Sequence, residues 1–262
     1  YGLLLLIELV LVRIFLVARN AGGFSAYLRS PEKFPRAPPE AYLHFSTISF
    51  VGMILTGGVL TALFASVDYN DTPQLKRYGY NNMSLLVAHA PATYVMPAYW
   101  FITAYGLVRY CMLDSERVLS RRLSKACRLC SLTVNLCLGL SAVLFSVALS
   151  LGPAAHVVAH ESPLLGVLVF IPLALLMQCW QLSFNCRPTC CHVVVVSLFA
   201  HVAVIYALAM VALRYRKMSP VFAPPLDWAW VVLATVSPLS ACQQHRNGAK
   251  KEESMKKEES VY

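Results

Sequence analysis

Seven long apolar runs constrain the fold of this chain more than any other feature. A helix needs about 20 mostly apolar residues to cross the hydrocarbon core of a bilayer. Only 13% of the 262 residues are charged, whereas a soluble domain usually has about 25%. The sequence therefore predicts an all-α, polytopic transmembrane helix bundle of six to seven spans. The runs cover residues 2–18, 45–66, 86–108, 129–151, 163–184, 192–213 and 221–241.

The first and last runs differ from the others. The first contains Arg13 and is followed by no small-residue cleavage site, so we expect a retained helix. The last contains Asp227 and three prolines, so we expect a short or broken membrane segment. These features predict five regions: an extra N-terminal membrane helix at 1–20, a cytoplasmic-side Pro-rich loop at 21–44, a helical core at 45–213, a Pro-interrupted segment at 214–241 and a charged tail at 242–262.

The charges in the loops predict the orientation of the bundle. Cytoplasmic loops of membrane proteins carry an excess of Lys and Arg. The loops after the first and third runs are basic here, so we expect both on the cytoplasmic side; Arg214, Arg216 and Lys217 are the main exception. The opposite side then holds glycosylation-type triplets at Asn70 and Asn82. They favour an endomembrane or the plasma membrane, while an organellar membrane, mitochondrial or plastid, remains an alternative.

The chain has a net charge of +9. In a membrane protein, loop asymmetry and contact with lipid headgroups account for such a charge. No basic stretch is interleaved with aromatic residues, so we expect membrane lipids and no nucleic acid as partners. The tail repeats the sequence KKEES. This polar segment is either a solvated helix end or a contact with other subunits of a membrane complex.

Two histidines lie where apolar runs begin. His89 opens the third run and His160 precedes the fifth, and both runs are expected to point from the outer face inward. The two side chains therefore share one depth, as two axial ligands of a haem in a helical bundle must. The alternative is that each is an interfacial residue bonded to water or to the backbone.

Short motifs around these histidines resemble the cytochrome b561 family. The stretch HAPATYVMPAYWFITAYGLVRY has a histidine followed closely by proline and ends near Arg109. The stretch HESPLLGVLVFIPLALLMQCW has His160 with a serine, a glycine and then Gln178, and His192 opens the sixth run after an arginine. The family carries electrons across a membrane through two haems b held by a four-helix core. The resemblance covers the second to the sixth run.

One family feature is missing from this sequence. The family has a histidine shortly after a lysine at its third span, but no histidine follows Lys125 here. Because the family pairs its third span with its fifth, His192 lacks a partner, whereas His89 and His160 form a complete pair. The resemblance thus implies a haem-b electron-transfer protein, either an electron carrier or an oxidoreductase, with one haem on the non-cytoplasmic side and His89 and His160 on the iron. The alternative is a haem-free accessory subunit of a larger assembly.

Weaker candidates complete the prediction. Arg109 and Lys125 are either part of an anion site or topology-setting residues. His201 lies in the middle of a run, where a polar residue usually faces the bundle interior, and is either a displaced ligand or a satisfied core histidine. Cys127, Cys130 and the cysteines before His192 are expected to be packing thiols rather than metal ligands.

Overall fold

The computed structural model describes residues 39–259, except residues 82, 84, 122, 151–156, 186–188 and 216–219. The predicted helix at 2–18 therefore lies outside the described residues. The described part is all-helical, without a strand. The long helices are α3 (Pro39–Phe64), α6 (Ala92–Ser120), α7 (Lys125–Ser150), α8 (Val157–Asn185), α9 (Cys190–Arg214) and α10 (Ala223–Glu259); α4 (Pro73–Tyr78), α5 (Leu85–Ala88) and the 3-10 turn η2 (Pro220–Phe222) are short.

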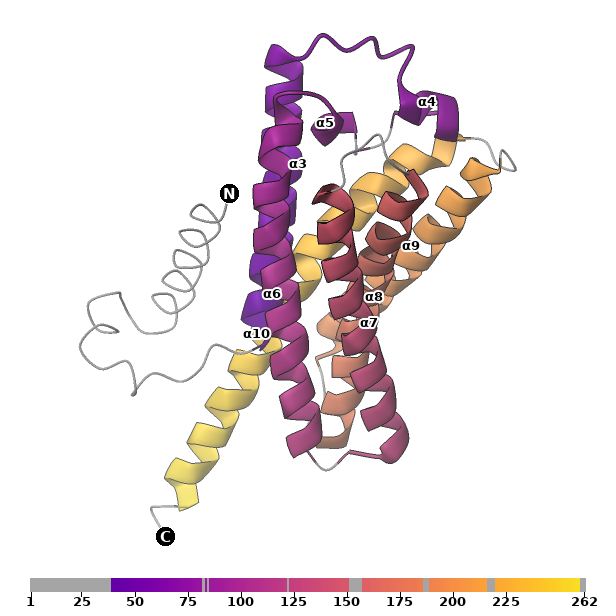
Figure 1. The fold of residues 1–262 in the computed structure, drawn as a ribbon. Coiled ribbons are helices and arrows are strands. Elements are labelled where there is room, and N and C mark those ends of the chain that lie inside the picture. Colours follow the sequence, from indigo (N-terminus) through magenta and orange to yellow (C-terminus); the bar gives the residue numbers. More distant parts are fainter. Residues whose placement is uncertain are drawn as a thin grey trace, which may run out of the picture.

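The six long helices pack side by side in one bundle (Figure 1), and their contacts close a ring. Each of them packs against the next long helix in chain order, and α10 returns to pack against α3. We call the end where α3 begins and α6 ends the inner end, and the end that carries α4 and α5 the outer end. Side chains from every helix of the ring can therefore meet in its interior.

Among the described residues, four helices are long and apolar enough to cross a membrane. They are α3 and the segments Lys125–Val147, Pro163–Ser183 and Cys190–Leu213 of α7, α8 and α9. Their exposed side chains are largely apolar, as expected of a surface in contact with lipid. These four helices confirm the predicted helical membrane protein, but they do not confirm the predicted number of six to seven spans. Helix α6 ends in the charged residues Asp114, Glu116 and Arg117, and α10 becomes polar after Ala241.

Two helix boundaries differ from the prediction. The run 86–108 is not one helix, because α5 ends at Ala88 and α6 begins at Ala92. Proline lacks a backbone N–H and restricts the residue before it, so Pro91 separates the two helices. The segment 214–241 and the tail are also not separate, because α10 continues without a break to Glu259. Its first two prolines lie in the first turn, where the missing N–H costs nothing.

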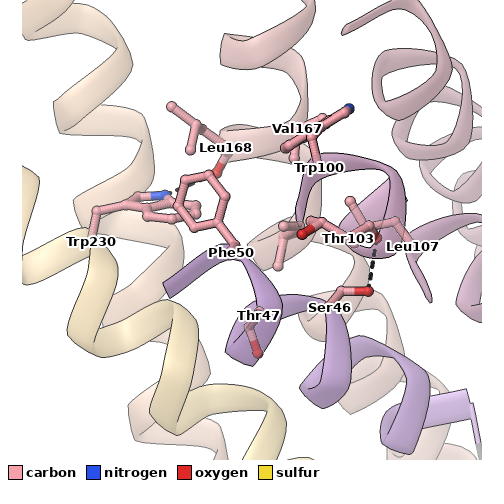
Figure 2. Close-up of a pocket in the computed structure, with 10 residues that line it drawn as sticks. Ser46, Thr47, Phe50, Trp100, Thr103, Leu107, Val167, Leu168 and Trp230 are labelled. Atoms are coloured by element: carbon pink, nitrogen blue, oxygen red, sulfur yellow. Dashed lines mark hydrogen bonds between the residues drawn. The ribbon is translucent and has the colours of Figure 1, made fainter. Parts of the chain in front are cut away.

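Aromatic rings fill the middle of the bundle (Figure 2). Trp100 is fully buried and meets Phe145 edge-on, with ring centroids 4.4 Å apart. Phe50 lies between Trp100 and Trp230, with ring centroids 6.4 Å and 5.8 Å away. Both indole N–H groups donate, to Ser146 Oγ and to the Leu168 carbonyl. The cavity beside these rings has a volume of about 10 Å³, which is room for about one water molecule.

Small residues bring α3 and α6 close together. Gly106 is buried, and a Cβ at this position would collide with Ser46 Oγ and lie 3.0 Å from the Tyr42 carbonyl oxygen. Ser46 Oγ lies 3.0 Å from the carbonyl oxygen of Tyr42 on its own helix and 3.0 Å from that of Thr103 on α6. These two oxygens share the single hydroxyl proton, so Ser46 links the two helices. Such close approach is typical of membrane helix pairs. It positions the start of α3 against the end of α6.

Candidate functional site

The predicted haem ligands are only partly within the described structure. His89 lies in the turn between α5 and α6, not on a helix. Its ring is half-buried, and its Nε2 atom is buried without a hydrogen-bond partner among the described residues. His160 belongs to α8, but its side chain lies outside the described residues. The helices α6 and α8 both pack against α7. The pairing of the two histidines therefore stays a prediction.

The weaker candidates are spread over the molecule. The Arg109 guanidinium lies over the Tyr42 ring, 5.8 Å from its centroid, and Lys125 is exposed at the start of α7. His201 was expected to face the bundle interior, and this is wrong. Its ring is exposed and bonds through Nδ1 to the Ser197 carbonyl oxygen one turn earlier, at 2.7 Å. A partner on its own helix lets this residue face outward.

A buried ionic cluster occupies the inner end of the ring. We call it the inner cluster, and it consists of Glu40, Asp114, Arg117, Asn135 and Gln178, from α3, α6, α7 and α8. Both carboxylate residues are almost fully buried, at 0% and 1% exposure. A buried ion is tolerated in an apolar interior only when it is paired and hydrogen-bonded. The geometry of the cluster shows how that condition is met.

Arg117 joins the two carboxylates. Its Nη1 atom donates to Glu40 Oε1, and its Nη2 and Nε atoms both donate to Asp114 Oδ1, with Nε at 3.0 Å. The planar guanidinium presents donors in a fixed fork, and a single lysine ammonium cannot reproduce this arrangement. Since Arg117 lies on α6 and Glu40 on α3, the ion pair holds these two helices together.

Amide side chains complete the inner cluster. Asn135 of α7 donates through Nδ2 to Asp114 Oδ2 at 2.8 Å. Gln178 of α8 donates through Nε2 to Glu40 Oε1. A carboxylate can only accept, so the Gln178 amide nitrogen must face Glu40 and its carbonyl oxygen must point elsewhere. That oxygen has no partner among the described residues.

His192 lies on the first turn of α9, at the inner end of the bundle. It is 1% exposed, and its Nδ1 atom is 2.8 Å from Ser240 Oγ of α10. The only proton of Ser240 goes to the Ser237 carbonyl oxygen at 2.7 Å. Both contacts are hydrogen bonds at the same time only when Nδ1 carries the imidazole proton and donates to Ser240. In the neutral ring Nε2 is then an acceptor, and it is buried without a partner among the described residues.

The outer end also buries a carboxylate, that of Asp227 near the start of α10. The Tyr80 hydroxyl lies 3.3 Å from both carboxylate oxygens of Asp227. Tyr206 and the backbone N–H of Met83 also favour the charged carboxylate. Asp227 lies outside the four apolar spans, and burial raises its pKa to about 6, although these donors lower it in part. We call Asp227 with Tyr80 and Tyr206 the outer cluster.

The cysteines form no metal centre among the described residues. Cys127 is buried and Cys130 is exposed, and the described cysteines are free thiols. No group of three or more His, Cys, Asp or Glu side chains in the described part of the chain is placed to hold a metal ion.

Sequence reasoning missed most of the inner cluster. Arg117 was assigned to topology together with the other basic loop residues, and Glu40 was assigned to a loop. The available signal was the acidic pair Asp114 and Glu116 at the end of an apolar run, on a side that is otherwise basic. Of its five residues only Gln178 had been singled out, through the family resemblance.

Comparison with known proteins does not assign the chain to a family. No protein-family model, curated protein or solved structure matches it. The resemblance to cytochrome b561 therefore stays a prediction that depends on the short motifs quoted above.

Proposed function

We propose that this chain is a haem-free accessory subunit of a membrane assembly. A relay of electrons across the bilayer needs acceptors at both depths of the bundle. At the inner end, where the resemblance would place a second haem, charged side chains of the protein are hydrogen-bonded to one another. The observation that carries this proposal is that Glu40, Arg117 and Asp114 occupy the inner end as a hydrogen-bonded ionic cluster.

The proposal includes α6 as a further membrane-crossing helix. It is 29 residues long and packs between α3 and α7, which are both apolar enough to cross. Its charged end is neutralised in part by the pairing of Asp114 with Arg117. The C-terminal part of α10 extends beyond the rest of the bundle (Figure 1), and it offers a polar helix to neighbouring subunits.

A second candidate function is that of a haem-b electron carrier with a single outer haem. The observation that favours it is the buried and unpartnered Nε2 atom of His89, because an imidazole nitrogen with a free lone pair is a suitable ligand for haem iron. His89 and His160 would hold the group, and it would supply one-electron transfer.

An absorbance experiment separates the two functions. We would record the reduced-minus-oxidised difference spectrum of the purified full chain, beside the His89→Ala, His160→Ala and His201→Ala variants. The haem-free proposal predicts a flat spectrum for all four proteins. A haem-b signal that is lost in His89→Ala and His160→Ala, but kept in His201→Ala with its exposed ring, would establish the carrier and overturn the proposal.

The accessory role has its own test. Native gel electrophoresis after mild detergent extraction should show the chain in a complex much larger than its own mass of 29.0 kDa. Removal of residues 246–262, which include the last part of α10, should reduce the size of that complex and leave the bundle folded. Monomeric migration of the untruncated chain would contradict the role.

A further inference from the structure

Two adjacent thiols open helix α9 on its outward side. Cys190 and Cys191 are both exposed, while the next residue, His192, is buried. Neither thiol packs in the bundle interior, unlike the buried thiol of Cys179. Free cysteines are among the most buried residue types, and reactivity rather than packing usually decides their role elsewhere. The pair is therefore available to a partner outside the bundle.

The exposed face of α9 continues from these thiols along the helix. With 3.6 residues per turn, Val194 lies about 40° from Cys190 and about 60° from Cys191 around the helix axis. Exposed side chains then follow at every third or fourth position, at Val194, Leu198, His201, Ile205 and Leu208. Four of these five side chains are apolar, as expected of a helix face in contact with lipid. The two sulfur atoms thus lie at the inner end of a lipid-facing stripe.

The depth of the two thiols matches the boundary of the bilayer. The segment Cys190–Leu213 has 24 residues, which is about 36 Å of helix at 1.5 Å per residue. The hydrocarbon core is about 30 Å thick, so a centred span extends about 3 Å, or about two residues, beyond it at each end. Cys190 and Cys191 are the first two residues of the span. The charges of the loops predict that this end faces the cytoplasm, where thiols stay reduced.

Contacts with α10 keep the thiols on the lipid side. The backbone N–H of Thr189 donates to Gln244 Oε1 of α10 at 3.1 Å. One turn further along α9, His192 Nδ1 is 2.8 Å from Ser240 Oγ of the same helix. These two contacts fix which side of the first turn of α9 faces the bundle. The side chains of Cys190 and Cys191 are therefore held outward.

We propose that Cys190 and Cys191 form a site of S-acylation, where a long-chain fatty acid is attached to sulfur as a thioester. The acyl donor is a fatty acyl-coenzyme A. The cysteine thiolate attacks the carbonyl carbon of the donor, a bond forms between that carbon and the cysteine sulfur, and the bond to the sulfur of coenzyme A breaks. Coenzyme A leaves as a thiolate and takes up the proton that the cysteine released, so no group is oxidised or reduced. Cysteines next to a membrane span are common targets of this reversible modification.

The position of the pair gives the attached chain a path. A fatty acyl group on either sulfur starts at the level where headgroups meet hydrocarbon. It enters the bilayer beside Val194 and Leu198 and lies along the exposed stripe of α9. No residue of the inner cluster takes part, so the proposal does not depend on which of the two functions above is correct.

Acyl-exchange labelling of the full chain in membranes of cultured eukaryotic cells tests the proposal. Free thiols are blocked with N-ethylmaleimide, thioesters are cleaved with neutral hydroxylamine, and each thiol released is labelled with a polyethylene glycol maleimide and counted by gel shift. We expect hydroxylamine-dependent tags in the wild type, and two fewer tags per chain in the double variant Cys190→Ala, Cys191→Ala. Cys179→Ala is the matched control, because it removes a buried thiol and should keep the wild-type number of tags.

Three results would overturn the proposal. The first is a wild-type chain without hydroxylamine-dependent tags, and the second is an equal number of tags in the wild type and the double variant. The third is a modification of Cys190 or Cys191 that dithiothreitol releases and hydroxylamine does not, which would identify a disulfide with another chain instead.

A second measurement needs no substitution and covers the case in which the double variant does not fold. Mass spectrometry of the wild-type peptide that contains Cys190 and Cys191 should show the added mass of one or two fatty acyl groups. Neutral hydroxylamine should remove this mass. If the peptide is recovered only with free thiols, the site is not acylated and the proposal is wrong.

Discussion

The two ends of the bundle bury their carboxylates with different partners. At the inner end Glu40 and Asp114 share the guanidinium of Arg117. At the outer end Asp227 has tyrosine hydroxyls and a backbone N–H, but no cation among its described partners. A carboxylate with a fixed positive partner keeps its charge over a wide pH range, whereas one with neutral donors is protonated more easily. We therefore expect the inner cluster to contribute to stability through its ion pairs, and the outer cluster to make stability depend on pH.

The largest effect is expected from removing the shared cation. Arg117→Met would leave two buried carboxylates without a positive partner, which should lower the free energy of unfolding by about 3–5 kcal/mol. The measurement is a denaturant titration in mixed micelles. Lys125→Met removes an exposed cation from the same end and should change that free energy by less than about 0.5 kcal/mol.

The triple variant Glu40→Gln, Asp114→Asn, Arg117→Met sharpens this result. It removes all three charges and keeps side chains of similar size, so it should recover much of the stability that Arg117→Met loses. If the triple variant is less stable than Arg117→Met, the unpaired carboxylates are not the reason why Arg117→Met is destabilised. Our description of the inner cluster would then be wrong.

A smaller effect is expected from the close contact that brings the inner cluster together. Gly106→Ala would place a Cβ against Ser46 Oγ and near the backbone of α3, where the carbonyl cannot move aside. Overpacking of this kind costs about 1–3 kcal/mol. Gly139→Ala is the matched control, because nothing lies within 4 Å of the added Cβ. It should be neutral or slightly stabilising, since alanine favours helix over glycine. Equal losses in both variants would show that α3 and α6 do not approach closely at Gly106.

The smallest effect concerns the outer cluster and its dependence on pH. Burial raises the pKa of Asp227 to about 6 in the folded chain, so the folded state binds the proton more tightly than the unfolded state. The stability contribution of this group is therefore lost as pH rises through about 6. Between pH 5 and pH 7 the outer cluster should lose on the order of 1 kcal/mol.

Hydrogen exchange of the segment from Leu75 to Tyr80 measures this change as a function of pH. Asp227→Asn cannot titrate and should make the exchange protection of that segment independent of pH over this range, after correction for the intrinsic exchange rate. Asp71→Asn changes an exposed carboxylate of the same region and should keep the wild-type dependence. If Asp227→Asn keeps it too, another group is responsible.

The helices could be predicted from the sequence because their signal is local. An apolar run of membrane length stabilises a helix wherever the rest of the chain lies, and the described runs do become helices. The boundary at Pro91 was also readable in principle, since a proline acts on its immediate neighbours. The prediction that His201 faces the interior was wrong for a related reason. The carbonyl oxygen of Ser197, one turn away on the same helix, is its hydrogen-bond partner, so the residue does not need a partner inside the bundle.

The inner cluster could not be predicted because its members are far apart in the chain. Glu40 meets Arg117 from 77 positions away and Gln178 from 138 positions away. Each of these residues has an ordinary local environment in the sequence, and nothing local selects its partner. Likewise, the sequence indicated His192 only through a resemblance, while the contact with Ser240 depends on how α9 packs against α10.

The sequence by itself determined that this is a membrane protein whose described part is helical, because the hydropathy of each run is a property of the run alone. Only the tertiary structure decided which carboxylate has a cation, which histidine nitrogen carries the proton and which buried acceptors are left without a donor. These outcomes depend on helix pairing, which brings single polar atoms from six different helices into one low-dielectric interior. In such an interior the free-energy cost of one unpaired charge is larger than the gain from many apolar contacts.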